Sequence, residues 1–275
     1  MNGLGKVRRF FGSAAVRQPN GVGAAQTTAE VRDYYERMTA AYLEGFGPVF
    51  QGSRPESTEE LLRYVAEALD LKPGMRLLDA GCGVGGPALW LARHHELIIE
   101  GLTISSVQAE AATRVATDAA LDGRLHFRQG DFHQLPELYP TESFDRVMFL
   151  ESLCHAESYR RVLAGARDVL KPGGALYIKD FHIVDQRRDP GRNRAQARDL
   201  AALNSLYRLT LPRQGDLVSL LCELGFLIRY MRMPAYEPTY THWSDYERVA
   251  GRHWAPASGA PGEVIQAVEF FCLKT

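Results

Sequence analysis

A run of closely spaced glycines with a carboxylate beside it is the first feature of this sequence that predicts chemistry. The segment 77–80 is apolar except for Asp79, and it precedes four glycines, namely Gly81, Gly83, Gly85 and Gly86. Glycine adopts positive φ and lets the backbone approach a bound ligand closely. The same spacing occurs in dinucleotide sites, and Glu100 lies at the distance along the chain where such sites carry an acidic residue. The glycines alone therefore leave the cofactor open.

Asp79 separates the two cofactor classes. It stands two residues before the first glycine, at the expected end of a strand. A carboxylate at this place would repel a pyrophosphate by about 1–4 kcal/mol. The same carboxylate attracts the ammonium and sulfonium groups of S-adenosylmethionine, so we predict that Asp79, Gly81 and Gly83 bind this cofactor. A cap on the following turn is the alternative role for Asp79, and a nicotinamide-dependent reductase is the alternative class of protein.

Two further strand ends complete an adenosine pocket. Thr103 follows the next predicted strand and Gln108 lies one turn into the helix after it, so both can reach ribose hydroxyls. Asp131 and Phe132 follow the third strand, where the carboxylate can accept from the adenine amino group and the ring can pack on the base. Each residue also has an ordinary interpretation as a helix cap or core aromatic. Their positions at three successive strand ends favour the pocket.

These residues require a sheet whose strands all end at one edge. Strands are predicted at 76–80, 98–102, 125–129, 146–150, 175–181, 226–233 and 264–273. Helices are predicted at 28–42, 57–69, 87–93, 106–120, 159–169 and 217–224. Strands that alternate with helices predict an α/β fold with a Rossmann-like parallel sheet, helices on both faces, and ligands at the carboxyl ends of the strands.

The remaining segments predict a lid. Residues 1–27 have the composition of a flexible tail, and 28–275 form one predicted domain. Within it, 28–56, 183–212 and 236–252 interrupt the alternation and are expected to cover the sheet edge as a helical lid. A Gly-Phe-Gly-Pro turn is predicted at 45–48.

Composition excludes several classes of function. The 275 residues are 45% apolar and 24% charged, which is ordinary for a globular protein. The net charge of −1 gives no general attraction to nucleic acid, and no run of about 20 apolar residues predicts membrane insertion. The four cysteines are far apart, and no apolar run of signal length follows the start. We expect reduced thiols, a cytoplasmic location and a small-molecule substrate, and a homodimer is compatible with the sequence.

Five segments together resemble one family of methyltransferases. They are 78–87, 101–105, 130–132, 151–156 and 170–174, and they are similar to motifs of sterol C-methyltransferases and prenyl diphosphate C-methyltransferases. The resemblance covers roughly 34–181 and includes 42–47, where Phe46 replaces the tryptophan of a Gly-Trp-Gly segment. Thr103 departs from the acidic residue common in class I methyltransferases, a departure typical of this subset. The sequence after 181 diverges, which weakens any inference about the substrate.

The resemblance implies transfer of a methyl group to an alkene carbon, which leaves a carbocation that must lose a proton. It places Glu151 after the fourth strand, where its carboxylate can stabilise the cation and accept the proton, and His155 one turn further as the second candidate base. The alternatives are that Glu151 binds a backbone amide or the amino end of the cofactor, and that His155 is a packed helix residue.

Aromatic side chains are the predicted partners of the cation. A cation over a ring is stabilised by up to about 2 kcal/mol in a dry site. The predicted members of the substrate site are Tyr35, Phe46, Tyr207, Tyr240 and Trp243. An aromatic residue at helical spacing is otherwise a core residue.

An arginine-rich segment suggests an anionic acceptor. Residues 187–213 contain seven arginines and two aspartates, a surplus of five positive charges. Arg194 and Arg198 are four apart on a predicted helix and can bind a phosphate together. We therefore predict a prenyl or isopentenyl diphosphate as the acceptor, with Mg²⁺ bridging it when a diphosphate binds, and no protein metal site. A sterol, or an oxygen or nitrogen atom of a small secondary metabolite, is the alternative acceptor, and a non-catalytic S-adenosylmethionine-binding protein is a further alternative.

Overall fold

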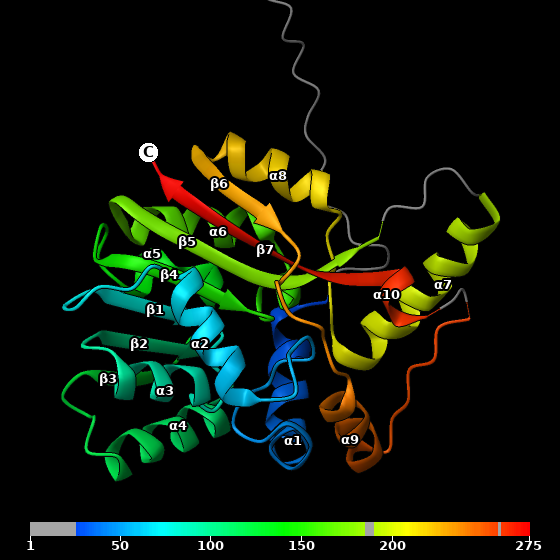
Figure 1. Ribbon diagram of the computed structural model, residues 1–275, viewed down its shortest axis with the longest axis horizontal. Helices are drawn as coiled ribbons and strands as arrows, with labels where there is room; N and C mark the ends of the chain where they lie inside the picture. Colours follow the sequence, from blue (N-terminus) through cyan, green and yellow to red (C-terminus); the bar gives the residue numbers. More distant parts are fainter. Residues whose placement is uncertain (1–25, 185–189, 258–259) are drawn as a thin grey trace, which may run out of the picture.

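The computed structural model of this 275-residue chain describes residues 26–184, 190–257 and 260–275, with side chains at 190–192 outside the description. Most of the predicted tail, 1–25, lies outside the described residues. Figure 1 shows a central twisted sheet with helices against both faces and further helices beyond the ends of its strands.

The sheet has seven strands in the order β3-β2-β1-β4-β5-β7-β6. Their bounds are β1 Arg76–Ala80, β2 Ile98–Thr103, β3 Leu125–Gln129, β4 Phe144–Leu150, β5 Leu170–Ile183, β6 Phe226–Arg232 and β7 Ile265–Lys274. The first five strands are parallel, as predicted. The parallel pattern stops at the other edge, where β7 inserts between β5 and β6 and runs antiparallel to both.

Helices cover the two faces of this sheet. Their bounds are α2 Thr58–Ala68, α3 Gly86–His94, α4 Ser106–Asp118, α5 Leu135–Leu138, α6 Tyr159–Val169 and α8 Gln214–Glu223. The short helix α10 Pro261–Val264 directly precedes β7. One apolar core joins α2, α3 and α4 to one face, and a second joins α5, α6 and α8 to the other. None of the described helices is long and apolar enough to cross a membrane.

Helices α1 Thr28–Phe46, α7 Pro190–Tyr207 and α9 Thr241–Ala250 lie beyond the carboxyl ends of the parallel strands (Figure 1). A third apolar core joins these three helices to the end of β5, and Tyr34, Leu203 and Tyr246 are among its most buried members. Helix α1 packs closely on α9, since a Cβ added to Gly45 would lie 2.5 Å from the backbone of Tyr246. The predicted turn at 45–48 therefore begins later, because Gly45 and Phe46 are still helical and Gly47 ends α1 with φ +67°.

Candidate active site

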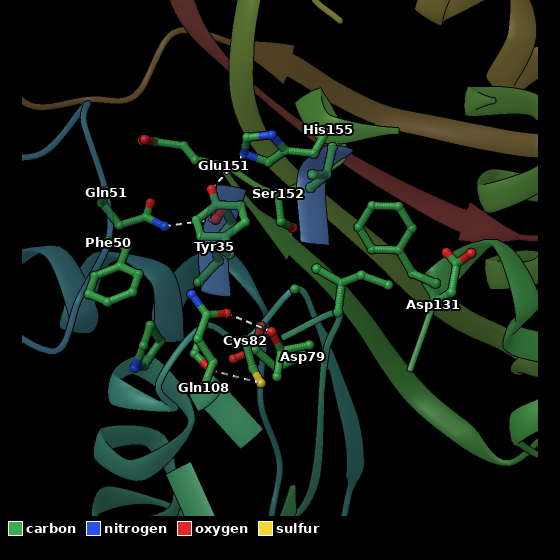
Figure 2. Close-up of a pocket in the computed structure, with 18 of the residues that line it drawn as sticks. Tyr35, Phe50, Gln51, Asp79, Cys82, Gln108, Asp131, Glu151, Ser152 and His155 are labelled. Atoms are coloured by element: carbon green, nitrogen blue, oxygen red, sulfur yellow. Dashed lines mark hydrogen bonds between the residues drawn. The ribbon is translucent and has the colours of Figure 1, made fainter. Parts of the chain in front are cut away.

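A cavity of about 800 Å³ lies at the carboxyl ends of the parallel strands (Figure 2). All seven residues predicted to bind the cofactor line it: Asp79, Gly81, Gly83, Thr103, Gln108, Asp131 and Phe132. They come from the ends of three neighbouring strands and from the first turn of α4. The residues that were chosen for their positions at strand ends thus line a single cavity.

Gly81 lets the loop after β1 pass directly beneath the loop after β4. Its φ is +98°, and an added Cβ would lie 2.3 Å from the Cβ of Ser152. The hydroxyl of Ser152 donates to the carbonyl of Ala80 at 2.6 Å, which ties the two loops together. Only glycine suits this conformation and this contact.

Asp79 is a buried carboxylate with one oxygen that no described residue hydrogen-bonds. The residue is 1% exposed, and its Oδ2 has no hydrogen-bond partner among the described residues. Burial raises the pKa of Asp79 from 3.8 to about 7. A cation in the cavity would supply the missing partner, so the site fits a ligand that carries an ammonium group.

The Gln108 amide is also incompletely bonded. Thr103 Oγ1 donates to Gln108 Oε1 at 2.6 Å, whereas Gln108 Nε2 has no partner in the described part of the chain. A free donor in a polar cavity suits a ligand hydroxyl or carboxylate. Together with Asp79 and the glycine cradle, these groups fit S-adenosylmethionine.

Asp131 is held by His133, which the sequence did not suggest. Oδ1 of Asp131 accepts from the backbone N of His133 at 2.8 Å and from its Nδ1 at 2.6 Å. The other ring nitrogen, Nε2, accepts from the backbone N of Glu157 and Ser158. Burial alone would raise the pKa of Asp131, but the hydrogen bonds from His133 outweigh burial and lower it. The carboxylate is therefore ionised and fixed at the cavity wall.

Glu100, the acidic residue that would be expected in a dinucleotide site, lies away from this cavity. Its carboxylate is 3.7 Å from Arg76 and 3.4 Å from His126. Glu100 is not among the residues that line the cavity. Its position on β2 is explained by these surface contacts.

A second cavity of about 460 Å³ adjoins the first, because Tyr35, Phe50, Glu151 and His155 line both. We call it the aromatic cavity. Its other lining residues are Tyr42, Phe46, Gly52, Cys154, Phe181, Tyr207, Leu209, Trp243 and Tyr246. Four of the five predicted substrate aromatics are thus present, namely Tyr35, Phe46, Tyr207 and Trp243.

Tyr240, the fifth, does not line either cavity, so the structure does not bring it together with the other four. It is the residue before the first turn of α9, and it is 42% exposed. Phe50, Cys154 and Tyr246 line the aromatic cavity but were not predicted from the sequence. Nothing in the sequence shows what Tyr246 faces.

Arg194 and Arg198 also lie outside both cavities. They share a face of α7, as their spacing predicts, but that face is exposed. The opposite face buries Leu200 and Leu203 in the third apolar core. Of the residues that the structure describes, no lysine or arginine lines either cavity. Arg187, Arg188 and Arg192 have side chains outside the described residues.

Glu151 reaches the boundary between the cavities but is already bonded to the protein. Its oxygens accept from the backbone N of Gly52 at 2.5 Å, the backbone N of Ser53 at 3.1 Å and Lys179 Nζ at 2.6 Å. Glu151 itself has φ +51°, a conformation held by its surroundings. The alternative role, acceptance of backbone amide hydrogens, is therefore observed, and the catalytic role stays a prediction.

Lys179 is the counterion of Glu151 and was missed. Its side chain is 0% exposed and donates also to Gln51 Oε1 and to the carbonyl of Ser53. Burial lowers the pKa of Lys179, but the Glu151 carboxylate outweighs this and holds it above its ordinary value. A lysine within the apolar strand β5 was the available signal, because a buried ammonium needs a partner.

His155 is neutral and has a defined tautomer. Its Nδ1 lies 2.8 Å from the carbonyl oxygen of Arg208, which can only accept, so Nδ1 carries the proton. Nε2 therefore accepts from the hydroxyl of Tyr35 at 2.7 Å. Burial lowers the pKa of His155 to about 4. Figure 2 shows Tyr35, Glu151 and His155 together at one end of the cavity and Asp79, Cys82 and Gln108 at the other.

Comparison with known proteins agrees with this geometry. The profile of a methyltransferase domain family matches residues 78–178. The chain is 36% identical over 178 residues to a sterol 24-C-methyltransferase of Gibberella zeae, an alignment that covers 62% of this chain and 46% of that protein. It is 30% identical over 252 residues to 24-methylenesterol C-methyltransferase 2 of Oryza sativa subsp. japonica, covering 86% of this chain and 68% of the relative.

A further relative acts on oxygen. The chain is 39% identical over 166 residues to 27-O-demethylrifamycin SV methyltransferase of Amycolatopsis mediterranei, covering 58% of this chain and 60% of that protein. The chain spans about half the length of the first curated relatives it matches.

Solved structures share the fold over nearly the whole chain. The [4+2]-cyclase SpnF superposes with a TM-score of 0.73 and 25% identity, covering 93% of this chain and 98% of that one. A geranyl diphosphate methyltransferase in complex with geranyl diphosphate and sinefungin superposes with a TM-score of 0.70 and 16% identity, covering 90% and 99%. The second likeness concerns the fold alone.

Proposed function

Since this chain belongs to the class I S-adenosylmethionine-dependent C-methyltransferases of the sterol and isoprenoid group, we propose that it methylates an alkene carbon of a neutral isoprenoid or sterol. Membership of this family excludes the alternative of a nicotinamide-dependent reductase. The observation that carries the proposal is the aromatic cavity, which adjoins the cofactor cavity and, among the described residues, is lined by no lysine or arginine. Such a cavity suits an apolar acceptor and a cation that forms on it.

Each cavity has a separate task in this proposal. Asp79, Gln108 and Asp131 hold the cofactor, which when bound supplies an electrophilic sulfonium methyl group. The aromatic rings orient the acceptor, exclude water and stabilise the positive charge that develops on its carbon. Helices α1, α7 and α9 serve as the lid that keeps both cavities dry.

Two groups are proposed to remove the final proton. The Tyr35–His155 pair can accept it as a relay, in which the Tyr35 oxygen takes the substrate proton while the Tyr35 hydroxyl proton moves to His155 Nε2. The resulting imidazolium would keep its hydrogen bond to the carbonyl of Arg208. Glu151 is the second candidate, since three donors leave part of its acceptor capacity unused.

A prenyl or isopentenyl diphosphate is the competing acceptor. The arginine-rich segment of the sequence favours it, and Mg²⁺ would then be expected to bridge the diphosphate. Against it, Arg194 and Arg198 lie outside both cavities. In the part of the chain that the structure describes, no three His, Cys, Asp or Glu side chains are grouped as a metal site.

The deciding experiment is a screen for label transfer from trideuteromethyl S-adenosylmethionine. The acceptors are sterols and neutral terpenes, prenyl diphosphates of increasing length with Mg²⁺, and hydroxylated macrocycles. We expect carbon-bound label on a neutral isoprenoid. Label on diphosphates alone would overturn the acceptor class, and label on oxygen alone would overturn the proposed reaction.

O-methylation of a secondary metabolite is the second candidate function. The rifamycin relative favours it, because it is the most identical of the relatives described above and its name specifies an oxygen acceptor. The Tyr35–His155 pair at the cavity junction would then take the hydroxyl proton through the Tyr35 oxygen, with the Tyr35 proton passing to Nε2 of the neutral His155.

The arginines provide a test of acceptor charge. We expect the double substitution Arg194→Ala and Arg198→Ala to change KM for the active acceptor by less than about twofold, because both side chains are exposed and outside the cavities. Initial rates over a range of acceptor concentrations measure this. A tenfold rise in KM for a diphosphate would instead return these arginines to the substrate site.

A further inference from the structure

Glu247 is a buried carboxylate behind the wall of the aromatic cavity, on α9. Its Oε1 accepts from the hydroxyl of Tyr207, from Trp243 Nε1 at 3.2 Å and from the backbone N of Trp254 at 2.8 Å. Its Oε2 is 3.1 Å from Nδ1 of His253, whose side chain is 77% exposed. Glu247 does not line either cavity itself. It acts on the cavity only through the rings that it binds.

Those rings form one continuous wall. Trp243 Nε1 also lies 2.9 Å from the Tyr207 hydroxyl, and the two rings meet edge to face with centroids 5.1 Å apart. Phe181 continues the wall at 5.8 Å from Trp243, again edge to face. The wall extends to Glu151, because the Trp243 ring fills the space beside Gly52, whose backbone N donates to Glu151.

A carboxylate behind such rings alters how the rings bind charge. When a phenol or indole donates a hydrogen bond to an anion, electron density shifts into the ring and its face becomes more negative. The anion adds its own field in a region from which water is excluded. The nearby Arg252 forms no ion pair with Glu247, since its guanidinium donates to the carbonyl of Leu206 and lies over the Tyr34 ring.

We propose that Glu247 is a positioning residue that fixes Tyr207 and Trp243 in the wall and makes the aromatic cavity selective for a positively charged guest. This inference rests on the proposed function, in which the guest is the carbocation formed on the acceptor. Neutral and cationic guests of one shape would then differ in affinity because of the charge behind the wall.

Two soluble probes of equal shape test this selectivity. Choline carries a trimethylammonium group, and 3,3-dimethylbutan-1-ol replaces its nitrogen by carbon. Their dissociation constants are measured by calorimetry or tryptophan fluorescence, on protein saturated with S-adenosylhomocysteine and near pH 8, where an ordinary histidine is neutral. We expect the wild type to favour choline by at least about tenfold.

Glu247→Gln is the decisive variant, because glutamine keeps an oxygen that accepts from Tyr207, Trp243 and Trp254. We expect the preference for choline to fall about tenfold. Tyr207→Phe, which keeps the ring but cuts its bond to Glu247, should lower the preference as well, and it serves if Glu247→Gln does not fold.

Glu269→Gln is the matched control. Glu269 is fully buried and accepts from the hydroxyls of Tyr64 and Tyr177 at 2.6 Å, but these tyrosines do not line either cavity. This variant should lose stability and keep the wild-type preference.

A preference unchanged in Glu247→Gln and Tyr207→Phe would overturn the inference while label transfer to an alkene still supported the proposed function. A wild type that binds both probes equally would also overturn the inference.

Discussion

Asp79→Asn weakens the binding of S-adenosylmethionine by about 100-fold or more, yet it stabilises the unliganded protein near pH 8. The loss of affinity is expected because the ligand's ammonium would be left in a buried site without its anion, which costs about 3–5 kcal/mol. The gain in stability is expected because the Asp79 carboxylate is buried and its Oδ2 has no partner in the described residues.

The sign of the pH dependence follows from the pKa of Asp79. Burial raises it from 3.8 to about 7, so the folded protein holds this proton more tightly than the unfolded chain does. The corresponding stability is complete below about pH 4 and is lost as the pH rises through 7. At pH 8 the wild type therefore carries a penalty on the order of 2–4 kcal/mol that Asp79→Asn removes.

Urea unfolding at pH 5 and pH 8, and calorimetric titration with the cofactor, measure both effects. Asp145→Asn is the control, because Asp145 lies outside the cavity. Lys171 and the backbone N of Arg76 donate to its carboxylate, and these bonds outweigh burial and lower its pKa. That variant should lose stability at pH 8 and keep cofactor affinity. Unchanged affinity in Asp79→Asn would remove this carboxylate from the cofactor site.

The cofactor half of the site was predictable because it depends on order along the chain. In a parallel sheet the carboxyl ends of successive strands meet at one edge, so Asp79, Thr103 and Asp131 must lie near one another once the strands are located. The charge of Asp79 then selected the cofactor class. No knowledge of side-chain contacts was needed for either step.

The acceptor half depends on contacts between distant segments, which local patterns do not reveal. Spacing showed that Arg194 and Arg198 share a helix face, but the packing of α7 against α1 and β5 decided that this face is exposed. Likewise, Tyr35 and His155 are 120 residues apart, and the hydrogen bond between them exists only because α1 packs against the turn at Leu153–His155. A charged residue in an apolar strand, such as Lys179, indicates a buried pair without naming its partner.

Glu151→Gln should therefore do more than reduce turnover. The substitution leaves the Lys179 ammonium fully buried without its counterion, and breaking such a pair costs about 3–5 kcal/mol. We expect this loss in the free energy of unfolding, together with a fall in kcat of at least about 100-fold if Glu151 acts on the cation or its proton. Since the loop at 52–53 also loses a charged acceptor, the single variant alone cannot separate chemistry from structure.

The double substitution Glu151→Gln and Lys179→Met separates them. Replacing both charges removes the uncompensated ammonium, so stability should return to within about 1 kcal/mol of the wild type. Lys179→Met alone keeps the Glu151 carboxylate bonded to Gly52 and Ser53. If Glu151 takes part in the reaction, the double variant regains stability but not kcat, and Lys179→Met retains measurable turnover. If kcat returns with stability, then Glu151 holds the loop over the cavity and the Tyr35–His155 pair is the base, because it is the other proton acceptor where the two cavities meet.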